Sequence, residues 1–252
     1  MMSTLEAPTS APGTLPHANP SATHWSLIRA AGDAESPRHA EALSDLAQRY
    51  WHPLYAFARR RGTSPDDARD LTQGFLSGFL ERNAAHNADP ARGRFRTFLL
   101  TCFRNYLTNE HARARTIRRG GGIDFVSLDA ASAEGRYLLG PSDTATPDQA
   151  YDRQWALGVL ERAFAAVREE YVAAGKSALH DRLRSLLWED PVETTYKELG
   201  ANLKLSEAAV KMAVVRLRRR IRLALFEEIA GTVRRKEDVE DEYRHLMTVL
   251  RE

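Results

Sequence analysis

The chain has a single cysteine, Cys102, among its 252 residues. An intramolecular disulfide and a metal site built from several thiolates of one chain are therefore excluded. The sequence also lacks an apolar run long enough to cross a bilayer. Its first residues lack the basic start and apolar core of a signal peptide. We therefore expect a cytoplasmic protein without membrane contact. A chain with one cysteine fits the reducing environment of the cytoplasm, in which disulfides rarely form.

The net charge is also small. The 36 Lys and Arg residues nearly balance the 34 Asp and Glu residues, so the whole molecule is not a polycation. The charges are unevenly placed, however: residues 92–119 and 204–222 are strongly basic, and residues 124–152 between them are mostly acidic. Segregation of this kind indicates local surfaces that bind anions.

The sequence shows no convincing strand pattern. Apolar residues instead recur at spacings of three and four residues, which is typical of amphipathic helices. Residues 1–23 are rich in Ala, Pro, Ser and Thr and show no period, so we expect a disordered tail there. We predict an all-α fold with two helical domains, over residues 24–119 and 151–230, a flexible acidic linker over residues 120–150, and a C-terminal amphipathic helix within residues 231–252 that packs back on the second domain.

Residues 195–225 predict two helices joined by a short turn. Thr195 and Glu198 have the spacing of a capping box, and Ser206 can cap the second helix. That helix combines an apolar stripe with basic faces, which is typical of a helix-turn-helix whose second helix enters a DNA major groove. Alternatively, a basic helix face is merely solvated. The stripe is Val210, Val214, Leu217, Ile221 and Leu225, and the cations are Lys211, Arg216, Arg218, Arg219, Arg220 and Arg222.

A long helix predicted from Arg94 to Arg119 interleaves aromatic residues with arginines. Such a helix can stack unpaired bases while its cations hold phosphates. The alternative is an aromatic stripe that faces the core, which we favour for Leu99, Cys102 and Phe103. The positions predicted to be exposed are Arg94, Arg96, Arg104, Asn105, Asn109, Arg113, Arg115, Arg118 and Arg119.

A further helix is predicted from Ser64 to about Asn83. Ser64 can cap it, Pro65 suits its first position, and Asp66 and Asp67 complement its dipole. No paired acid and base falls on one face of any predicted helix, and no metal-ligand spacing occurs. We therefore predict no enzymatic activity and no cofactor.

Three segments together resemble a bacterial sigma-70-family RNA polymerase sigma factor of the extracytoplasmic-function type. Residues 67–73 (DARDLTQ) resemble the D-A-x-D-L-x-Q signature of region two, and residues 92–99 (RGRFRTFL) with Arg104 and Asn105 resemble its promoter-melting part. Residues 196–199 (YKEL), with Leu205, Ser206, Glu207, Val210, Lys211 and Arg216, resemble region four. The resemblance covers the chain from residue 25 to about residue 230.

The resemblance implies a protein that binds core RNA polymerase and directs it to specific promoters. Such a protein contacts polymerase, duplex promoter DNA and a melted strand, and an anti-sigma factor is a further candidate partner. The polymerase-binding residues implied are Asp66, Asp67, Asp70, Leu71 and Gln73. The residues implied for the melted minus-ten strand are Arg94, Phe95, Phe98, Arg104, Asn105, Asn109 and Arg113, and those for the minus-thirty-five duplex are Glu207, Lys211, Arg216 and Arg219.

The second helix of the helix-turn-helix departs from the family pattern. Ala209, Met212, Ala213 and Val215 stand where relatives more often show Thr, Ser, Arg and His. The promoter sequence therefore cannot be carried over from relatives. Two alternative functions stay open: a helix-turn-helix regulator that binds duplex DNA without polymerase, and an adaptor that occupies polymerase without reading DNA.

Overall fold

The computed structural model describes residues 24–82, 84–89, 93–114, 134–137, 144–187, 193–230, 233 and 236–251. These residues form α-helices and one 3-10 turn, and no β-strand occurs among them. The prediction of an all-α fold is confirmed. The predicted tail and residues 115–133 of the predicted basic helix and linker lie outside the described part of the chain.

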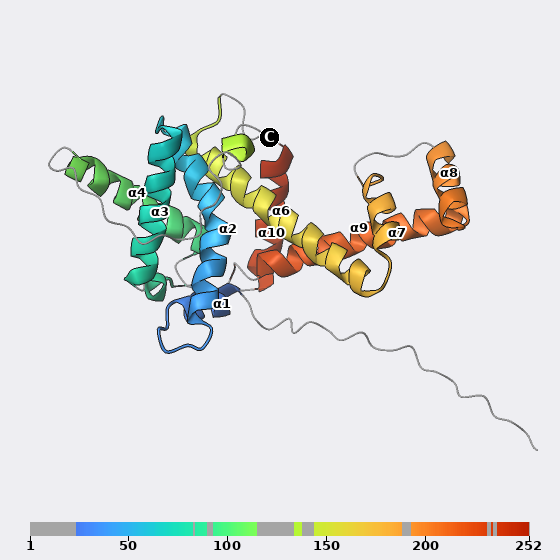
Figure 1. Ribbon diagram of the computed structural model, residues 1–252, viewed down its shortest axis with the longest axis horizontal. Coiled ribbons are helices and arrows are strands. Elements are labelled where there is room, and N and C mark those ends of the chain that lie inside the picture. Colours follow the sequence, from blue (N-terminus) through green and yellow to red (C-terminus); the bar gives the residue numbers. More distant parts are fainter. Residues whose placement is uncertain are drawn as a thin grey trace, which may run out of the picture.

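The N-terminal helices lie together in one part of the molecule (Figure 1). Aromatic side chains form much of the core between them. They are α1 (His24–Ala31), α2 (His39–Arg60), α3 (Pro65–Glu81) and α4 (Phe95–Ala114), with a 3-10 turn η1 (Ala84–Asn87) between α3 and α4. Phe103 of α4 lies 4.9 Å from Phe75 of α3 and 6.0 Å from Phe57 of α2, measured between ring centroids. The middle of the aromatic stripe on α4 therefore faces the core, as predicted for Leu99 and Phe103. Cys102 is half-buried, and burial raises the pKa of its thiol.

Local residues account for two of these helix ends. The Ser64 hydroxyl accepts a hydrogen bond from the Asp67 backbone N–H at 3.2 Å, and Pro65 occupies the first turn of α3. Gly62 adopts a φ of +88° directly after α2, a conformation that residues with a Cβ rarely adopt. The predicted start of α3 is therefore confirmed, and Gly62 allows the chain to turn after α2.

The C-terminal helices are α6 (Pro147–Ala173), α7 (Ser177–Arg184), α8 (Glu193–Leu203), α9 (Glu207–Ala230) and α10 (Lys236–Arg251). A capping box at Thr146 and Gln149 starts α6, with hydrogen bonds of 3.2 and 2.8 Å. Helix α6 packs against α2 along one part of its length and against α9 along another (Figure 1). The two halves of the chain therefore share a hydrophobic core through α6.

Part of the predicted flexible linker is ordered against α2. Residues 134–137 form a helical turn, and Glu134 accepts hydrogen bonds from Tyr55 at 2.5 Å and Arg59 at 2.6 Å. For residues 134–137 the prediction of a flexible linker is wrong, because contacts distant in sequence hold Glu134 in place. Helix α6 begins at Pro147, so the predicted linker over residues 120–150 overlaps its first turn.

Helices α8 and α9 are joined by a tight turn at residues 204–206. The Leu205 N–H donates to the Gly200 carbonyl at 2.9 Å, and Lys204 has a φ of +55°. A Cβ on Gly200 would lie 2.7 Å from the Leu205 carbonyl oxygen, so the turn requires glycine there. The Ser206 hydroxyl accepts from the Ala209 N–H at 3.2 Å, which confirms the predicted cap of α9. Helix α8 begins at Glu193, two residues before the predicted cap Thr195, whose side chain lies outside the described part of the chain.

Candidate nucleic-acid and partner interface

The first turns of α3 present an acidic surface to solvent. The side chains of Asp66 and Asp70 are largely exposed and flank Arg69, whose guanidinium lies 3.4 and 3.5 Å from their carboxylates. Asp67 is also exposed and accepts a hydrogen bond from the Ser64 hydroxyl at 2.7 Å. Acids in this position are stabilised by the positive end of the helix dipole. Their charge is therefore available to a basic partner at little cost to the fold.

The other two predicted docking residues, Leu71 and Gln73, are half-buried. Gln73 lines a cavity of about 350 Å³ between α2, α3 and α6, together with residues such as Trp51 and Gln154. His52 also lines this cavity, and its burial, aided by the nearby Arg136 cation, lowers its pKa to about 4. The predicted docking residues thus form two groups: the exposed acids Asp66, Asp67 and Asp70, and the half-buried side chains of Leu71 and Gln73 next to them.

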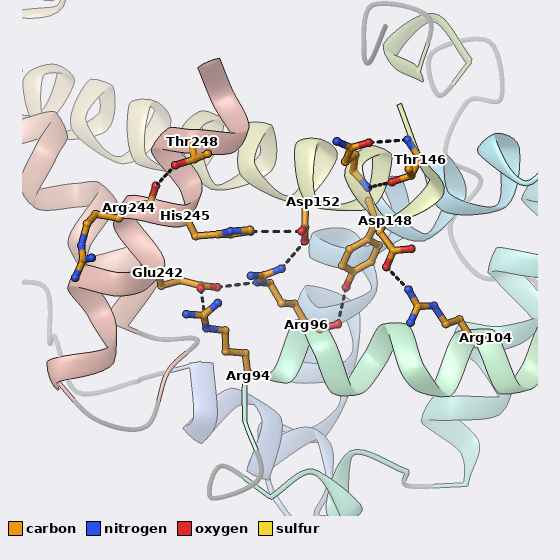
Figure 2. Close-up of polar contacts among 12 residues, drawn as sticks. Arg94, Arg96, Arg104, Thr146, Asp148, Asp152, Glu242, Arg244, His245 and Thr248 are labelled. Carbon is orange, nitrogen blue, oxygen red and sulfur yellow. Dashed lines mark hydrogen bonds and ion pairs between the residues drawn. The ribbon is translucent and has the colours of Figure 1, made fainter. Parts of the chain in front are cut away.

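The start of α4 is covered by the C-terminal helix. Figure 2 shows Arg94 and Arg96 pointing at one carboxylate, that of Glu242 on α10. The Nε atoms of both arginines lie 2.8 Å from its two oxygens, and the residue is 0% exposed. Arg96 is 6% exposed, so its predicted exposed position is wrong. The error arises because α10, distant in sequence, supplies the partner.

A second acid completes this network (Figure 2). Asp152 of α6 pairs with the other end of the Arg96 guanidinium and lies 3.4 Å from His245 Nε2 of α10. Burial tends to raise the pKa of Asp152, but the contacts of its carboxylate with His245 and Arg96 outweigh it and lower the pKa. The Tyr151 hydroxyl donates to the Arg96 carbonyl at 3.0 Å. Charges and hydrogen bonds therefore tie α4, α6 and α10 together.

Sequence reasoning missed Glu242 and Asp152, although one signal for Glu242 was present. Glu242 lies three residues after Val239 and four before Leu246, on the apolar face of the C-terminal helix. An acid on an apolar face is buried only with a partner. The pattern therefore indicates a buried ion pair, but it does not name the arginines.

The remaining predicted strand-binding residues of α4 divide by exposure. Phe95 is 1% exposed and packs against Tyr50 at 5.3 Å, so the structure places it in the core and not on a nucleic-acid surface. Phe98 is half-buried, and Arg104 pairs with Asp148 while its guanidinium lies 5.5 Å from the Phe57 ring. Asn105 and Asn109 are exposed. The Arg113 side chain lies outside the part of the chain that the structure describes.

The cations of α9 separate into two groups. Three of them contact the protein: Arg218 donates to the Leu186 carbonyl at 3.1 Å, Arg220 pairs with Glu170 and Glu227, and Arg222 lies 5.5 Å from the rings of Phe226 and Tyr243. These side chains hold α9 against its neighbours.

The other cations of α9 lie toward solvent. Arg216 and Arg219 are exposed, and Arg216 contacts only the preceding turn of its own helix among the contacts described, at the Met212 carbonyl. Lys211 pairs with Glu207 one turn earlier at 2.6 Å, and its ammonium lies 5.5 Å from the Tyr196 ring. The predicted apolar stripe is buried on the opposite face of the helix. We call the face opposite this stripe, which carries Met212, Val215, Arg216 and Arg219, the open side of α9. Two of the four predicted duplex contacts lie on it, and the other two, Glu207 and Lys211, form a half-exposed pair at its edge.

The described residues offer no group of three or more His, Cys, Asp or Glu side chains that could hold a metal ion. Among the helices of the described chain, none is both long enough and apolar enough to span a membrane.

Comparison with known proteins gave one match. Neither a curated protein nor a solved structure matched the chain. Residues 46–117 match the family model described as Sigma-70 region 2. This segment contains most of α2 and all of α3 and α4, and thus both the acidic surface of α3 and the aromatic-basic helix. A region of this kind implies binding to core RNA polymerase and promoter DNA, and the match supports the role of a sigma-70-family sigma factor for this chain.

Proposed function

We propose that this protein is a sigma factor of the extracytoplasmic-function type, which binds core RNA polymerase and directs it to specific promoters. The observation that carries the proposal is the match of residues 46–117 to Sigma-70 region 2, together with the exposed acids of α3 inside that segment. The α8–α9 pair downstream adds an exposed basic helix face, which suits a duplex promoter element. The protein acts in the cytoplasm and catalyses no reaction of its own.

Docking to polymerase uses the acidic surface of α3. Asp66, Asp67 and Asp70 supply charge that steers and orients a basic partner. Leu71 and Gln73 supply the apolar and amide contacts at the edge of that surface. The partner is a helical element of the polymerase large subunit, as the family resemblance implies.

Promoter recognition uses two surfaces. Phe98, Arg104, Asn105 and Asn109 of α4 capture the melted strand, because aromatic and amide groups can stack on and hydrogen-bond to an unpaired base. The open side of α9 reads the upstream duplex, with Arg216 facing base edges and Arg219 close to the backbone. An initiation factor needs both kinds of contact, since it recognises a promoter and stabilises its opening.

A reconstituted transcription reaction tests the proposal. Purified chain is added to core polymerase with a duplex library randomised upstream of a reporter, and initiated transcripts are sequenced. We expect initiation at a shared promoter sequence, with Asp70→Lys weakening core binding at least tenfold and Glu169→Lys, an exposed acid on α6, leaving it unchanged. No initiation by the chain with core polymerase would contradict the proposal.

The rival is a helix-turn-helix regulator that needs no polymerase. It is favoured only by the α8–α9 pair, and it leaves the acidic surface of α3 without a role. Sequence-specific duplex binding by the chain alone, with no association with core polymerase, would establish that rival.

A further inference from the structure

The open side of α9 is unusual in carrying large apolar side chains among its cations. Met212 is 54% exposed and Val215 is 55% exposed. Leu205, in the turn before α9, is 39% exposed. Three of the five large apolar residues that are exposed in the described chain therefore lie at the start of this one helix. Single exposed apolar residues need no explanation, but a group of them indicates a contact surface.

Helical geometry places these residues at the centre of the open side. Ala208, Met212, Val215 and Arg219 recur at spacings of four, three and four residues, so they lie along one line of the helix. The buried stripe through Val210, Val214 and Leu217 lies on the other side. Met212 and Val215 are therefore the side chains that project farthest from the core over the first half of α9.

Apart from Glu207, which pairs with Lys211 at the start of the helix, the charges around this apolar centre are positive. Residues 208–223 contain no acid, and Arg216 and Arg219 flank Met212 and Val215 on the open side. A surface with an apolar centre and a rim of guanidinium groups suits a polyanion that also presents small apolar groups. The DNA major groove presents such groups as the C5 methyls of thymine.

We propose that Met212 and Val215 contact thymine methyl groups in the major groove, so that the duplex element read by α9 contains thymines at fixed positions. This inference rests on the function proposed above and adds its specificity. Lys211 and Arg216 on either side bind base edges or phosphates, and the two apolar side chains select thymine over cytosine. The element is thus defined partly by methyl groups, in a way that the family resemblance does not provide.

The test removes the methyl groups and nothing else. The upstream duplex element is first selected with the full chain and core polymerase, and each thymine in it is then replaced by deoxyuridine. Removing one buried methyl is expected to weaken binding about fourfold. In Met212→Ala or Val215→Ala, the same replacement at the contacted position should change binding less than twofold. Val172→Ala, which alters an exposed apolar residue at the end of α6, is the matched control and keeps the full methyl effect.

Three results would overturn the inference. Deoxyuridine at every position could leave binding unchanged while Arg216→Ala abolishes selectivity. The selected element could contain no thymine. The two apolar variants could leave duplex binding intact but weaken binding to core polymerase, which would make the surface a protein contact. The function proposed above survives all three, and it fails only if the chain and core polymerase select no element.

The start of α4 holds a second feature that bears on function, a buried acid of α10 paired with two arginines. Glu242 is fully buried between the guanidinium groups of Arg94 and Arg96. A buried carboxylate deprived of its cations is strongly disfavoured. If both arginines turned to a DNA phosphate, Glu242 could therefore not stay where it is.

From this we infer that α10 covers the start of α4 in the free protein, and that capture of the promoter strand displaces it. A phosphate can replace the Glu242 carboxylate as the partner of the two arginines, and Glu242 then moves to water. Helix α10 must shift with it, because Glu242 lies on the same buried face of α10 as the apolar residues Val239, Leu246 and Val249, and this face packs against α6 and α9. This inference also rests on the proposed function, and it adds Arg94, which the family resemblance implies for the melted strand, to the strand-binding residues named there.

Hydrogen exchange of residues 238–250 provides the test. We expect slow exchange in the free chain and at least tenfold faster exchange in the initiating complex with core polymerase and promoter. Glu242→Gln should speed exchange in the free chain and increase binding of a single-stranded oligonucleotide carrying the selected promoter sequence. Asp241→Asn removes the same charge from the exposed neighbouring residue and should do neither.

If the amides of α10 exchanged at the same rate or more slowly in an active complex than in the free chain, the inference that α10 is displaced would be contradicted. The same holds if Asp241→Asn and Glu242→Gln increase oligonucleotide binding equally, because the effect is then one of net charge. A chain that does not initiate with core polymerase would instead refute the proposed function.

Discussion

The start of α4 and the open side of α9 are both rich in arginine, but they differ in what surrounds the arginines. At α4, Arg94 and Arg96 share the buried Glu242, and Arg96 also pairs with Asp152. At α9, Arg216 and Arg219 point to solvent in a stretch of sequence without acids. In the free protein the first pair is held by buried acids, whereas the second is open to a ligand. A basic motif in a sequence therefore does not by itself distinguish a binding surface from a buried ion-pair network.

Among variants that test this comparison, Glu242→Ala is expected to cause the largest loss of unfolding free energy. The change leaves the buried Arg96 guanidinium with Asp152 as its remaining acid and Arg94 with none of the acids described here, and breaking a buried ion pair costs about 3 kcal/mol of unfolding free energy. Denaturant unfolding of the full chain measures the loss. Asp241→Ala, on the exposed side of α10, should cost less than about 0.5 kcal/mol. Equal losses from the two variants would remove the distinction between the two regions.

The reverse pattern is expected at α9. Arg216→Ala should leave the free energy of unfolding within about 0.5 kcal/mol of wild type, because the side chain is exposed. The same change should weaken binding to the selected duplex by about 1–3 kcal/mol, if the guanidinium contacts a base edge. Filter binding with core polymerase measures the second quantity. A loss of stability that matches the loss of binding would show that Arg216 supports the fold instead.

The pH dependence of stability separates the α4 network from the cavity near α2. His52 has a folded pKa of about 4, below its usual 6.5, so the unfolded chain takes up a proton first as the pH falls. Stability should decrease from pH 6.5 to pH 4 by about 1–2 kcal/mol, a value reduced to allow for the partial exposure of His52. His52→Gln should flatten this part of the curve, as measured by denaturant unfolding across the pH range.

Asp152 acts in a different pH window. Its folded pKa is lowered, so its contribution to stability is complete above its usual value near 4 and is lost as the pH falls through the folded pKa. Asp152→Asn should therefore change the curve below pH 4, leaving the slope between pH 6.5 and 4 intact. If that slope disappeared in Asp152→Asn, the α4 network would be its source.

The smallest effect is expected from Arg220→Ala. Arg220 lies on α9 like Arg216, but it ties the helix to Glu170 and Glu227 on a partly exposed surface. We expect a loss of about 0.5–1 kcal/mol in unfolding free energy, with the sequence preference in duplex binding unchanged. A thermal melt measures the loss of stability, and the same filter-binding assay measures the sequence preference. Loss of sequence preference in this variant would extend the reading surface to the side of α9.

Local patterns in the sequence were sufficient for most of the helices. The Ser64 cap of α3, the buried stripe of α9 and the Ser206 cap all follow from residues within a few positions. What failed depended on distant partners. Arg96 was expected on the surface because nothing near it in sequence is acidic, whereas Glu242 lies 146 residues away. Part of the expected linker is likewise held by Arg59 through Glu134.

The candidate site shows the same division. The acids of α3 and the open side of α9 were predicted correctly as exposed, because amphipathic spacing separates a buried face from an open one. Phe95 lies four residues before Leu99 on the same apolar stripe, so spacing alone favours the core for it, whereas the family resemblance assigned it to the melted strand; it packs against Tyr50 of α2. Its neighbours in space are set by how α2 and α4 cross.

The most direct test of the sigma-factor proposal is promoter-dependent initiation by core RNA polymerase on a duplex template, with and without the full-length chain. We predict transcripts from one shared promoter class only when the chain is present, and their loss when Asp70 is changed to Lys. Normal duplex binding by the chain with no transcript from core polymerase would contradict the proposal.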